Sequence, residues 1–207
     1  MKILEPLPYA YDSLEPYIDQ ETMHIHFDKH YNAYFNKFIK AIEGTELEGK
    51  DVKEILKELN FIPEKIKQTV INNGGGYFNH RFFWNILKKD VEFKGKIAEE
   101  INNRWESFEK FKKELSQAAL TQFGSGWAWL VYDKKNNKLK IIKTANQDCP
   151  LSNGYEPLIV IDIWEHAYYL KYQNKRNEFV ENFFNIINWE KVDKLYSEAK
   201  LNENRSC

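Results

Sequence analysis

The hydrophobic pattern changes its period part-way along the chain, and this change constrains the fold more than any other feature. Up to about residue 123, apolar residues recur at the spacing of amphipathic helices, as in KIAEEINNRW and SFEKFKKELSQAALTQF, where Ser107 is a suitable N-cap. Three segments rich in aromatic and β-branched residues follow: GWAWLVYD, KLKIIKT and PLIVIDI. The KKNN between the first two suits a hairpin turn, and HAYYLKY and NEFVENFFNII are again helical in pattern.

This order of segments predicts an α+β protein. We expect an N-terminal long helical hairpin domain over residues 1–92. A C-terminal α/β domain with a small three-stranded antiparallel sheet should follow over residues 93–207. The chain has 207 residues, of which 43% are hydrophobic, so it can bury one large core or two small ones.

Proline and capping residues indicate where the helices of the first half begin. Residues 1–18 contain three prolines and are expected to form an extended arm. Asp19 is a suitable N-cap for a helix that continues to about Ile42. The segment ELEGKDVKEILKELN should form a short surface helix, and a further helix is expected from Pro63 to Ile86.

Charge and cysteine content exclude several classes of protein. The 30 Lys and Arg residues balance the 31 Asp and Glu residues, which gives no reason to expect nucleic acid or membrane as a partner. The first residues, MKILEPLPYAYDSLEPYID, lack the apolar core of a signal peptide. Two cysteines, Cys149 and Cys207, do not make a disulfide framework. We therefore expect a reduced, cytoplasmic protein.

Three consecutive glycines, Gly74, Gly75 and Gly76, lie within the helix expected from Pro63 to Ile86. Each glycine costs about 1 kcal/mol of helix stability relative to alanine. Either another part of the chain approaches this backbone closely, or the run forms a kink or loop between two helices.

A carboxylate and an imidazole follow the third predicted strand at a spacing of four residues. Asp162 and His166 lie in DIWEH, directly after the apolar run that ends at Ile161. From the end of a buried strand, the two side chains could bind one metal ion from two sides. A carboxylate that orients a structural histidine is the alternative.

Two other segments contain histidines that could complete such a site. In HIHFDKHYNAY, His26, His30 and Tyr34 are four residues apart and share one helix face. His80 ends the segment NNGGGYFNH. Together with the Asp162 pair, the three segments offer three imidazoles and one carboxylate to a single ion.

This combination of ligands narrows the choice of metal. Three neutral imidazoles and a carboxylate suit zinc, manganese or iron, whereas magnesium and calcium prefer more oxygen ligands. A structural zinc site would be closed by these four ligands and would leave no position for a reacting molecule. Tyr34, on the helix face of His26, and Gln147, upstream of the third strand, could hydrogen-bond a solvent molecule on the metal and tune the ion.

Four motifs carry a family resemblance: HxxxHxxxY, GGGxxNHxxFW, GSGWxWL and DxWEHAYYLxY, in this order. With them, nearly the whole chain resembles the iron/manganese superoxide dismutase family. The resemblance implies one manganese or iron ion per subunit, bound by His26, His80, Asp162 and His166. It implies disproportionation of superoxide to O₂ and H₂O₂, which requires an ion that changes valence and therefore excludes zinc.

The resemblance also implies roles for residues around the ion. Catalytic or tuning positions correspond to His30, Tyr34, Gln147, Gly76, Tyr77, Trp127 and Val160. The aromatic wall corresponds to Trp84 and Trp164, with Trp127, and Trp129 is expected in the core. Glu165 and Tyr169 match residues that bridge two subunits, which implies a homodimer or, alternatively, a tetramer. Lys29 and Arg176 would draw the superoxide anion inward.

The sequence leaves the identity of the metal open. Gln147 opposite Gly76 follows the pattern of manganese-type members. However, Tyr77 replaces a histidine common in that type, and Val160 is bulkier than the glycine frequent at its position. Iron, manganese and the use of either ion are all compatible with these residues.

Two other classes of protein share part of the pattern. A non-haem iron oxygenase uses two histidines and one carboxylate, and needs a pocket for an organic co-substrate. The third histidine and the aromatic crowding count against an oxygenase. A non-catalytic metal-binding protein would bind the ion without superoxide-dependent turnover.

Overall fold

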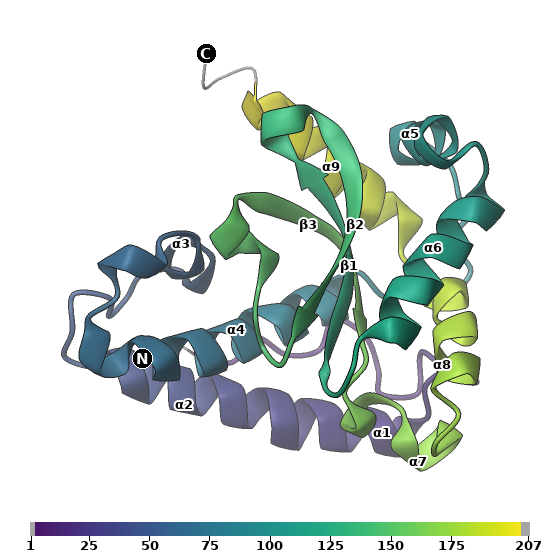
Figure 1. Cartoon of the computed structure of the whole chain (residues 1–207). Coiled ribbons are helices and arrows are strands. Elements are labelled where there is room, and N and C mark those ends of the chain that lie inside the picture. The colour runs from purple at the N-terminus through teal and green to yellow at the C-terminus, as the bar shows by residue number, and fades with distance from the viewer. Residues whose placement is uncertain (1–2, 204–207) are drawn as a thin grey trace.

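The computed structural model describes residues 3–203 and contains a pair of long N-terminal helices beside a small sheet (Figure 1). Cys207 lies outside this range. The sheet and the helices of the second half rest against one side of the helical pair (Figure 1). The predicted α+β fold class, a helical hairpin followed by an α/β part with three antiparallel strands, is confirmed.

The first long helix begins where its capping residue predicts. Asp19 caps it by accepting a hydrogen bond from the Thr22 amide. The helix runs through α1 (Gln20–His24), the π-helical segment η1 (Ile25–Tyr31) and α2 (Asn32–Ile42). The end at Ile42 was expected, whereas the π-helical segment was not. Such wider turns occur frequently at functional sites because they redirect side chains.

The second long helix, α4 (Glu64–Asn85), starts directly after Pro63 and packs against α2. Before it lie α3 (Val52–Lys57) and the 3₁₀ turn η2 (Leu59–Phe61), so the predicted surface helix is shorter than its pattern suggested.

The glycine run does not interrupt α4, so the alternative of a loop between two helices is wrong. A Cβ atom on Gly74 would lie 3.0 Å from the Phe38 ring, and one on Gly76 would lie 2.5 Å from the Tyr34 ring. A Cβ atom on Gly75 would overlap the backbone oxygen of Gln147. The glycines therefore allow both α2 and the loop containing Gln147 to approach α4 closely.

The sheet consists of β1 (Gly126–Asp133), β2 (Lys138–Ala145) and β3 (Tyr155–Asp162). Its strands are antiparallel in the order β2-β1-β3, and every residue of the central strand β1 is buried. β1 pairs with β3 from Trp127 opposite Asp162. This pairing places the end of β3 in the interior of the protein.

Helices of the second half surround the sheet. They are α5 (Lys96–Trp105), α6 (Phe108–Thr121), α8 (Arg176–Phe183) and α9 (Trp189–Glu203). Ser107 caps α6 as predicted. Short elements lie between the strands and helices of this half: η3 (Lys134–Asn136), η4 (Pro150–Asn153), η5 (Glu165–Ala167), α7 (Tyr169–Tyr172) and η6 (Phe184–Ile186). The helical pattern of HAYYLKY is thus divided between η5 and α7.

The N-terminal arm differs from its prediction. Residues 3–7 have no regular structure, but consecutive turns follow, with hydrogen bonds from Ser13 to Ala10 and from Tyr17 to Leu14. An extended arm up to residue 18 is therefore wrong. Leu14 and Ile18 are buried, and the turns allow both to reach the core.

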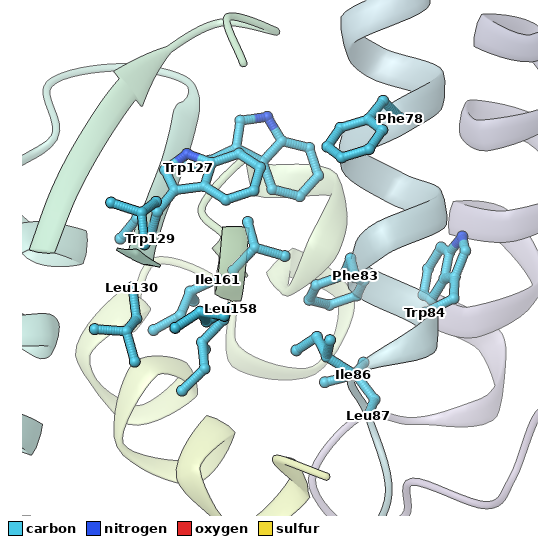
Figure 2. Close-up of a cluster of buried hydrophobic side chains, with 14 of the residues drawn as sticks. Phe78, Phe83, Trp84, Ile86, Leu87, Trp127, Trp129, Leu130, Leu158 and Ile161 are labelled. Carbon is cyan, nitrogen blue, oxygen red and sulfur yellow. The ribbon is translucent and has the colours of Figure 1, made fainter. Parts of the chain in front are cut away.

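Aromatic side chains fill the space between α4 and the sheet (Figure 2). Phe78 and Phe83 come from α4, and Trp127 and Trp129 from β1. Trp129 is a core residue, as expected, and its indole donates to Thr144. No helix within residues 3–203 combines the length and hydropathy needed to cross a bilayer.

The end of α4 is connected to the C-terminal part of the chain. Leu87 forms an isolated antiparallel bridge with Ile187, and the Lys88 amide donates to the Ile186 carbonyl. The division into domains at residues 92 and 93 stays a prediction.

Candidate metal centre

Four side chains from four separate elements meet between the helical pair and the sheet. His26 comes from η1, His80 from α4, Asp162 from the end of β3 and His166 from η5. One nitrogen or oxygen of each lies within 4.8 Å of the others. The Asp162 Oδ2 atom is 3.1 Å from His26 Nε2, 3.5 Å from His166 Nε2 and 3.7 Å from His80 Nε2. The predicted ligand set therefore forms one cluster.

These four atoms have no hydrogen-bond partner within residues 3–203, although all are buried. A buried polar atom without a partner costs about 1–3 kcal/mol. Four such atoms that face one another fit a cation, which would interact with all of them at once. The residues present thus suit the metal that the sequence predicts.

The remaining polar atoms of two ligands are hydrogen-bonded in a way that leaves the facing atoms available. His80 Nδ1 lies 2.6 Å from the Gly76 carbonyl oxygen. An N–H at Nδ1 that donates to this oxygen leaves a lone pair at Nε2. The Trp164 amide donates to Asp162 Oδ1 at 2.9 Å, so Oδ2 is free to bind a metal.

Burial sets the protonation states that metal ligands need. It lowers the pKa of His26 to about 4 and that of His80 well below its usual range, so both imidazoles are neutral at pH 7. Burial alone would raise the pKa of Asp162. The close approach of His166 and His26 outweighs it, and the pKa of Asp162 falls. A charged carboxylate beside neutral imidazoles is the state that binds a cation.

Gln147 is hydrogen-bonded to Tyr34 and Trp127, whose rings lie near His80. Its Nε2 atom donates to the Tyr34 hydroxyl at 3.0 Å, and its Oε1 atom accepts from Trp127 Nε1 at 3.1 Å. The Tyr34 ring lies 5.2 Å from the His80 ring, between centroids. Tyr34 thus lies beside His80, and Gln147 is hydrogen-bonded to Tyr34; the roles expected for these two residues stay predictions.

Two family models match this chain. The alpha-hairpin domain of iron/manganese superoxide dismutases matches residues 3–88, and their C-terminal domain matches residues 93–195. The chain belongs to the iron/manganese superoxide dismutase family. It is therefore an oxidoreductase that converts superoxide to O₂ and H₂O₂, with one manganese or iron ion as cofactor. This result decides against the iron oxygenase and the non-catalytic metal-binding protein.

Asn79 belongs to the dismutase site but was missed in the sequence. Its Nδ2 atom donates to the Gln147 carbonyl at 3.2 Å, and its side chain is buried. Asn79 therefore holds the backbone of the residue that reaches Tyr34. The available signal was an amide side chain directly before His80, in a helical stretch that is otherwise apolar or glycine.

Tryptophans surround the ligands of the dismutase. Trp84 lies 4.6 Å from the His26 ring, and Trp127 lies 5.0 Å from the His80 ring, both edge-on. Trp164 stacks on His166 at 5.4 Å. These contacts restrict the rotation of the imidazoles and limit the access of water.

His30 lies on the accessible side of the cluster. Its ring stacks on His166 at 4.1 Å. His166 has a side chain that is 12% exposed, whereas the other three ligands are almost fully buried. Burial and the proximity of His166 lower the pKa of His30. A small anion would therefore approach the ligands past His30 and His166.

Tyr77 and Val160 lie in the elements that carry two of the ligands, α4 and β3. The Tyr77 ring stacks on Tyr31 at 5.7 Å, and Tyr31 in turn lies 6.1 Å from His80. Val160 is buried in β3, paired with Trp129. The roles expected for these two residues in tuning the metal stay predictions.

Four further residues named from the sequence lie at or near the surface. Lys29 is exposed on η1, while Arg176 donates to the Tyr168 hydroxyl and the Gln122 carbonyl. Glu165 and Tyr169 are exposed on either side of His166 in the sequence.

Proposed function

We propose that the dismutase binds its single manganese or iron ion through the Nε2 atoms of His26, His80 and His166 and the Oδ2 atom of Asp162. One observation carries this assignment: these four buried atoms face one another, and none has a hydrogen-bond partner within residues 3–203. Such a cluster of unpaired atoms is costly unless a cation occupies its centre.

The bound ion would supply the redox chemistry, taking one electron from a first superoxide and giving it to a second, so that two superoxide anions and two protons yield O₂ and H₂O₂. The protein must then deliver protons and restrict the site to small anions. We assign proton delivery to Tyr34 and His30, and the positioning of Tyr34 to Gln147.

The hydrogen bonds around Gln147 support these roles. Trp127 donates to the amide oxygen of Gln147, so the amide nitrogen is directed toward the Tyr34 hydroxyl. Tyr34 accepts this bond and retains its own O–H for donation. Burial raises the pKa of Tyr34, which keeps the phenol protonated at neutral pH.

Manganese, iron or either ion can serve, and the activity per metal atom distinguishes these cases. The protein should be stripped and reloaded with each metal, and its metal content measured. Suppression of cytochrome c reduction by superoxide then gives the turnover of each form. High activity with one metal alone identifies that metal, and similar activities identify a site that uses both.

The Asp162→Ala variant is the control, because it should lose both the ion and the activity. If neither metal form of the native protein suppresses cytochrome c reduction, the assignment of the site is wrong. An active Asp162→Ala variant with a full metal content would also refute it.

We further propose that the enzyme is a homodimer in which Glu165 and Tyr169 contact the partner subunit. Glu165 is exposed and makes no ion pair among the described residues. Tyr169 and Leu170 are 48% and 51% exposed, so large apolar side chains face outward next to the site. Glu165 would then pair with the partner subunit's His166, and Tyr169 with the partner subunit's His30.

Sedimentation velocity tests the dimer. The native protein should sediment as a dimer at micromolar concentration, and Glu165→Ala should shift it toward monomer. Glu109→Ala, an exposed glutamate on α6, is the matched control and should leave the dimer intact. A native protein that is monomeric under these conditions would contradict the proposal.

We propose a cytoplasmic location, supported by the free thiol of the buried Cys149. Fractionation of the source cells with an antibody against the enzyme tests this location. Recovery in a secreted or organelle fraction would contradict it.

A further inference from the structure

A cavity of about 560 Å³ lies between α3, α4, β3 and α9. None of the four metal ligands lines it, so it is distinct from the dismutase site. Its walls come from both halves of the chain: Lys57 and Phe82 from the N-terminal helices, and Pro157 and Leu195 from β3 and α9. Its volume is within the range of about 300–1,000 Å³ that is usual for small-molecule sites.

Positive charge dominates the cavity walls, although the whole chain has a formal charge of −1. Two carboxylates, Glu156 and Glu198, line the cavity. The cationic side chains that line it are Lys53, Lys57, Arg81, Lys134 and Lys191. A concave surface with such an excess of one charge concentrates ligands of the opposite charge.

Glu156 neutralises part of this charge and holds two of the lysines in place. Its two oxygens each lie 2.9 Å from an ammonium group, one from Lys53 and one from Lys134. The Glu156 side chain is 13% exposed, so the two ion pairs are partly shielded from solvent. This part of the wall is therefore ordered before any ligand binds.

The other cations differ in how far they are neutralised. Lys57 pairs with Glu54, which is largely exposed. Arg81 lies 3.6 Å from Asp51, and its guanidinium also lies 5.3 Å from the centroid of the Tyr77 ring. Within residues 3–203, the Lys191 ammonium has no ion pair. Lys57 and Lys191 are therefore the cations most available to an anion, and Arg81 adds positive charge to the same wall.

An aromatic and aliphatic surface adjoins the cations. Phe82 is half-buried, and its ring stacks on that of Phe78 with centroids 6.0 Å apart. Ile86, Pro157 and Leu195 extend this surface. Inorganic phosphate alone would leave these apolar groups unused, whereas a ligand with a flat ring would cover them.

We propose that this cavity binds a small organic phosphate that carries a flat aromatic ring, that is, a ligand of the nucleotide class. Its phosphate groups would interact with Lys57, Arg81 and Lys191, and its ring would pack on Phe82. The ligand would contact both halves of the chain at once, so it should stabilise the folded enzyme against heat.

Isothermal titration calorimetry of the metal-loaded enzyme tests this site with three probes: ADP, pyrophosphate and inorganic phosphate. We expect ADP to bind most tightly, pyrophosphate more weakly, and phosphate most weakly. The metal content should be measured before and after titration, so that removal of the ion by the probes is recognised. The melting temperature should rise with ADP concentration.

Two kinds of variant separate the charged and the apolar parts of the site. Lys57→Glu and Lys191→Glu should each weaken ADP binding by about tenfold or more, since each reverses a charge beside the phosphates. Lys65→Glu, an exposed position on α4 outside the cavity, is the matched control and should bind ADP like the native enzyme. Phe82→Leu should weaken ADP binding but leave pyrophosphate binding unchanged.

Glu156→Gln provides a variant with gained affinity. Removal of this carboxylate charge frees Lys53 and Lys134 for the phosphates, so ADP should bind more tightly.

The proposal is overturned if ADP at millimolar concentration gives no saturable heat, or if Lys65→Glu weakens binding as much as Lys57→Glu. If ADP and pyrophosphate bind with equal affinity, the proposed contact between the ADP ring and Phe82 is wrong. Dismutase turnover in these variants tests the metal centre separately and should be unchanged.

Discussion

Replacement of Gly75 by alanine tests the close approach of α4 to the loop that carries Gln147. The new Cβ atom would overlap the Gln147 backbone oxygen, which cannot rotate away as a side chain could. Gly74→Ala is the matched variant, since its Cβ atom would lie 3.0 Å from the ring of Phe38. Both substitutions are in the same helix and gain about 1 kcal/mol of helix propensity.

The magnitude follows from the difference between these two contacts. Overpacking costs about 1–3 kcal/mol, and we expect Gly75→Ala at the upper end and Gly74→Ala at the lower end. After the gain in propensity, Gly75→Ala should lose about 2 kcal/mol of unfolding free energy and Gly74→Ala should be near neutral. For a protein of this size, this difference corresponds to a fall of about 4–8 °C in Tm.

Urea unfolding of the metal-free forms measures the two variants without a contribution from metal binding. Turnover per metal atom, measured on the loaded forms, should fall more in Gly75→Ala, because displacement of the loop moves Gln147 away from Tyr34. If Gly75→Ala is as stable as Gly74→Ala, the close approach does not limit this position and the reasoning is refuted.

Four single substitutions test other parts of the molecule. Asp162→Ala should abolish tight metal binding, measured by metal analysis after dialysis, because the one anionic ligand is lost. Tyr34→Phe should retain the metal but alter turnover, measured by stopped-flow, because the hydroxyl bound by Gln147 disappears. Asp193→Ala removes the acceptor of the Ile97 amide in the first turn of α5 and should cost about 1 kcal/mol in urea unfolding, with turnover unchanged. Glu156→Gln should be less stable than the native protein at pH 7, and this difference should vanish in acid.

The pH dependence of Glu156→Gln follows from the sign of the pKa shift. Burial alone would raise the pKa of Glu156, but the ammonium groups of Lys53 and Lys134 outweigh it and lower the pKa below its ordinary value of 4.5. A carboxyl whose pKa falls on folding stabilises the protein above its unfolded pKa. That contribution is lost as the pH falls through the folded pKa, so urea unfolding at a series of pH values measures it. A difference that persists unchanged into acid would exclude the ion pairs as its cause.

For each of the other three substitutions, one result would contradict the expected outcome. Full metal content in Asp162→Ala would remove this carboxylate from the ligand set. Loss of metal in Tyr34→Phe would make Tyr34 a structural residue. A stable Asp193→Ala would mean that another group caps α5.

Features set by local chemistry could be predicted from the sequence. Asp19 and Ser107 cap helices because their side chains accept bonds from nearby amides, whatever the remote structure. The ligand cluster was predicted from spacing and a family resemblance. At Gly75 the sequence could not decide between a continuous helix and a break, because only the position of Gln147 shows which group approaches the glycine.

Features set by remote contacts could not be predicted. The turns before residue 18 depend on the burial of Leu14, and the amide of Asn79 is recognisable only when its acceptor is known. Arg176 was expected to face the superoxide, but its hydrogen bonds with Tyr168 and Gln122 also give it a structural role. The wide turn at η1 has no sequence signal that we could identify.

The separation of the ligands along the chain has a consequence for how a cell must fill this centre. His26 and His80 leave the ribosome before Asp162 and His166, because both precede that pair in the chain. Until Asp162 has been synthesised, the nascent polypeptide can therefore offer a passing ion only two of the four ligands, His26 and His80. The complete ligand set can therefore form only after β3 has paired with β1 and η5 has followed it.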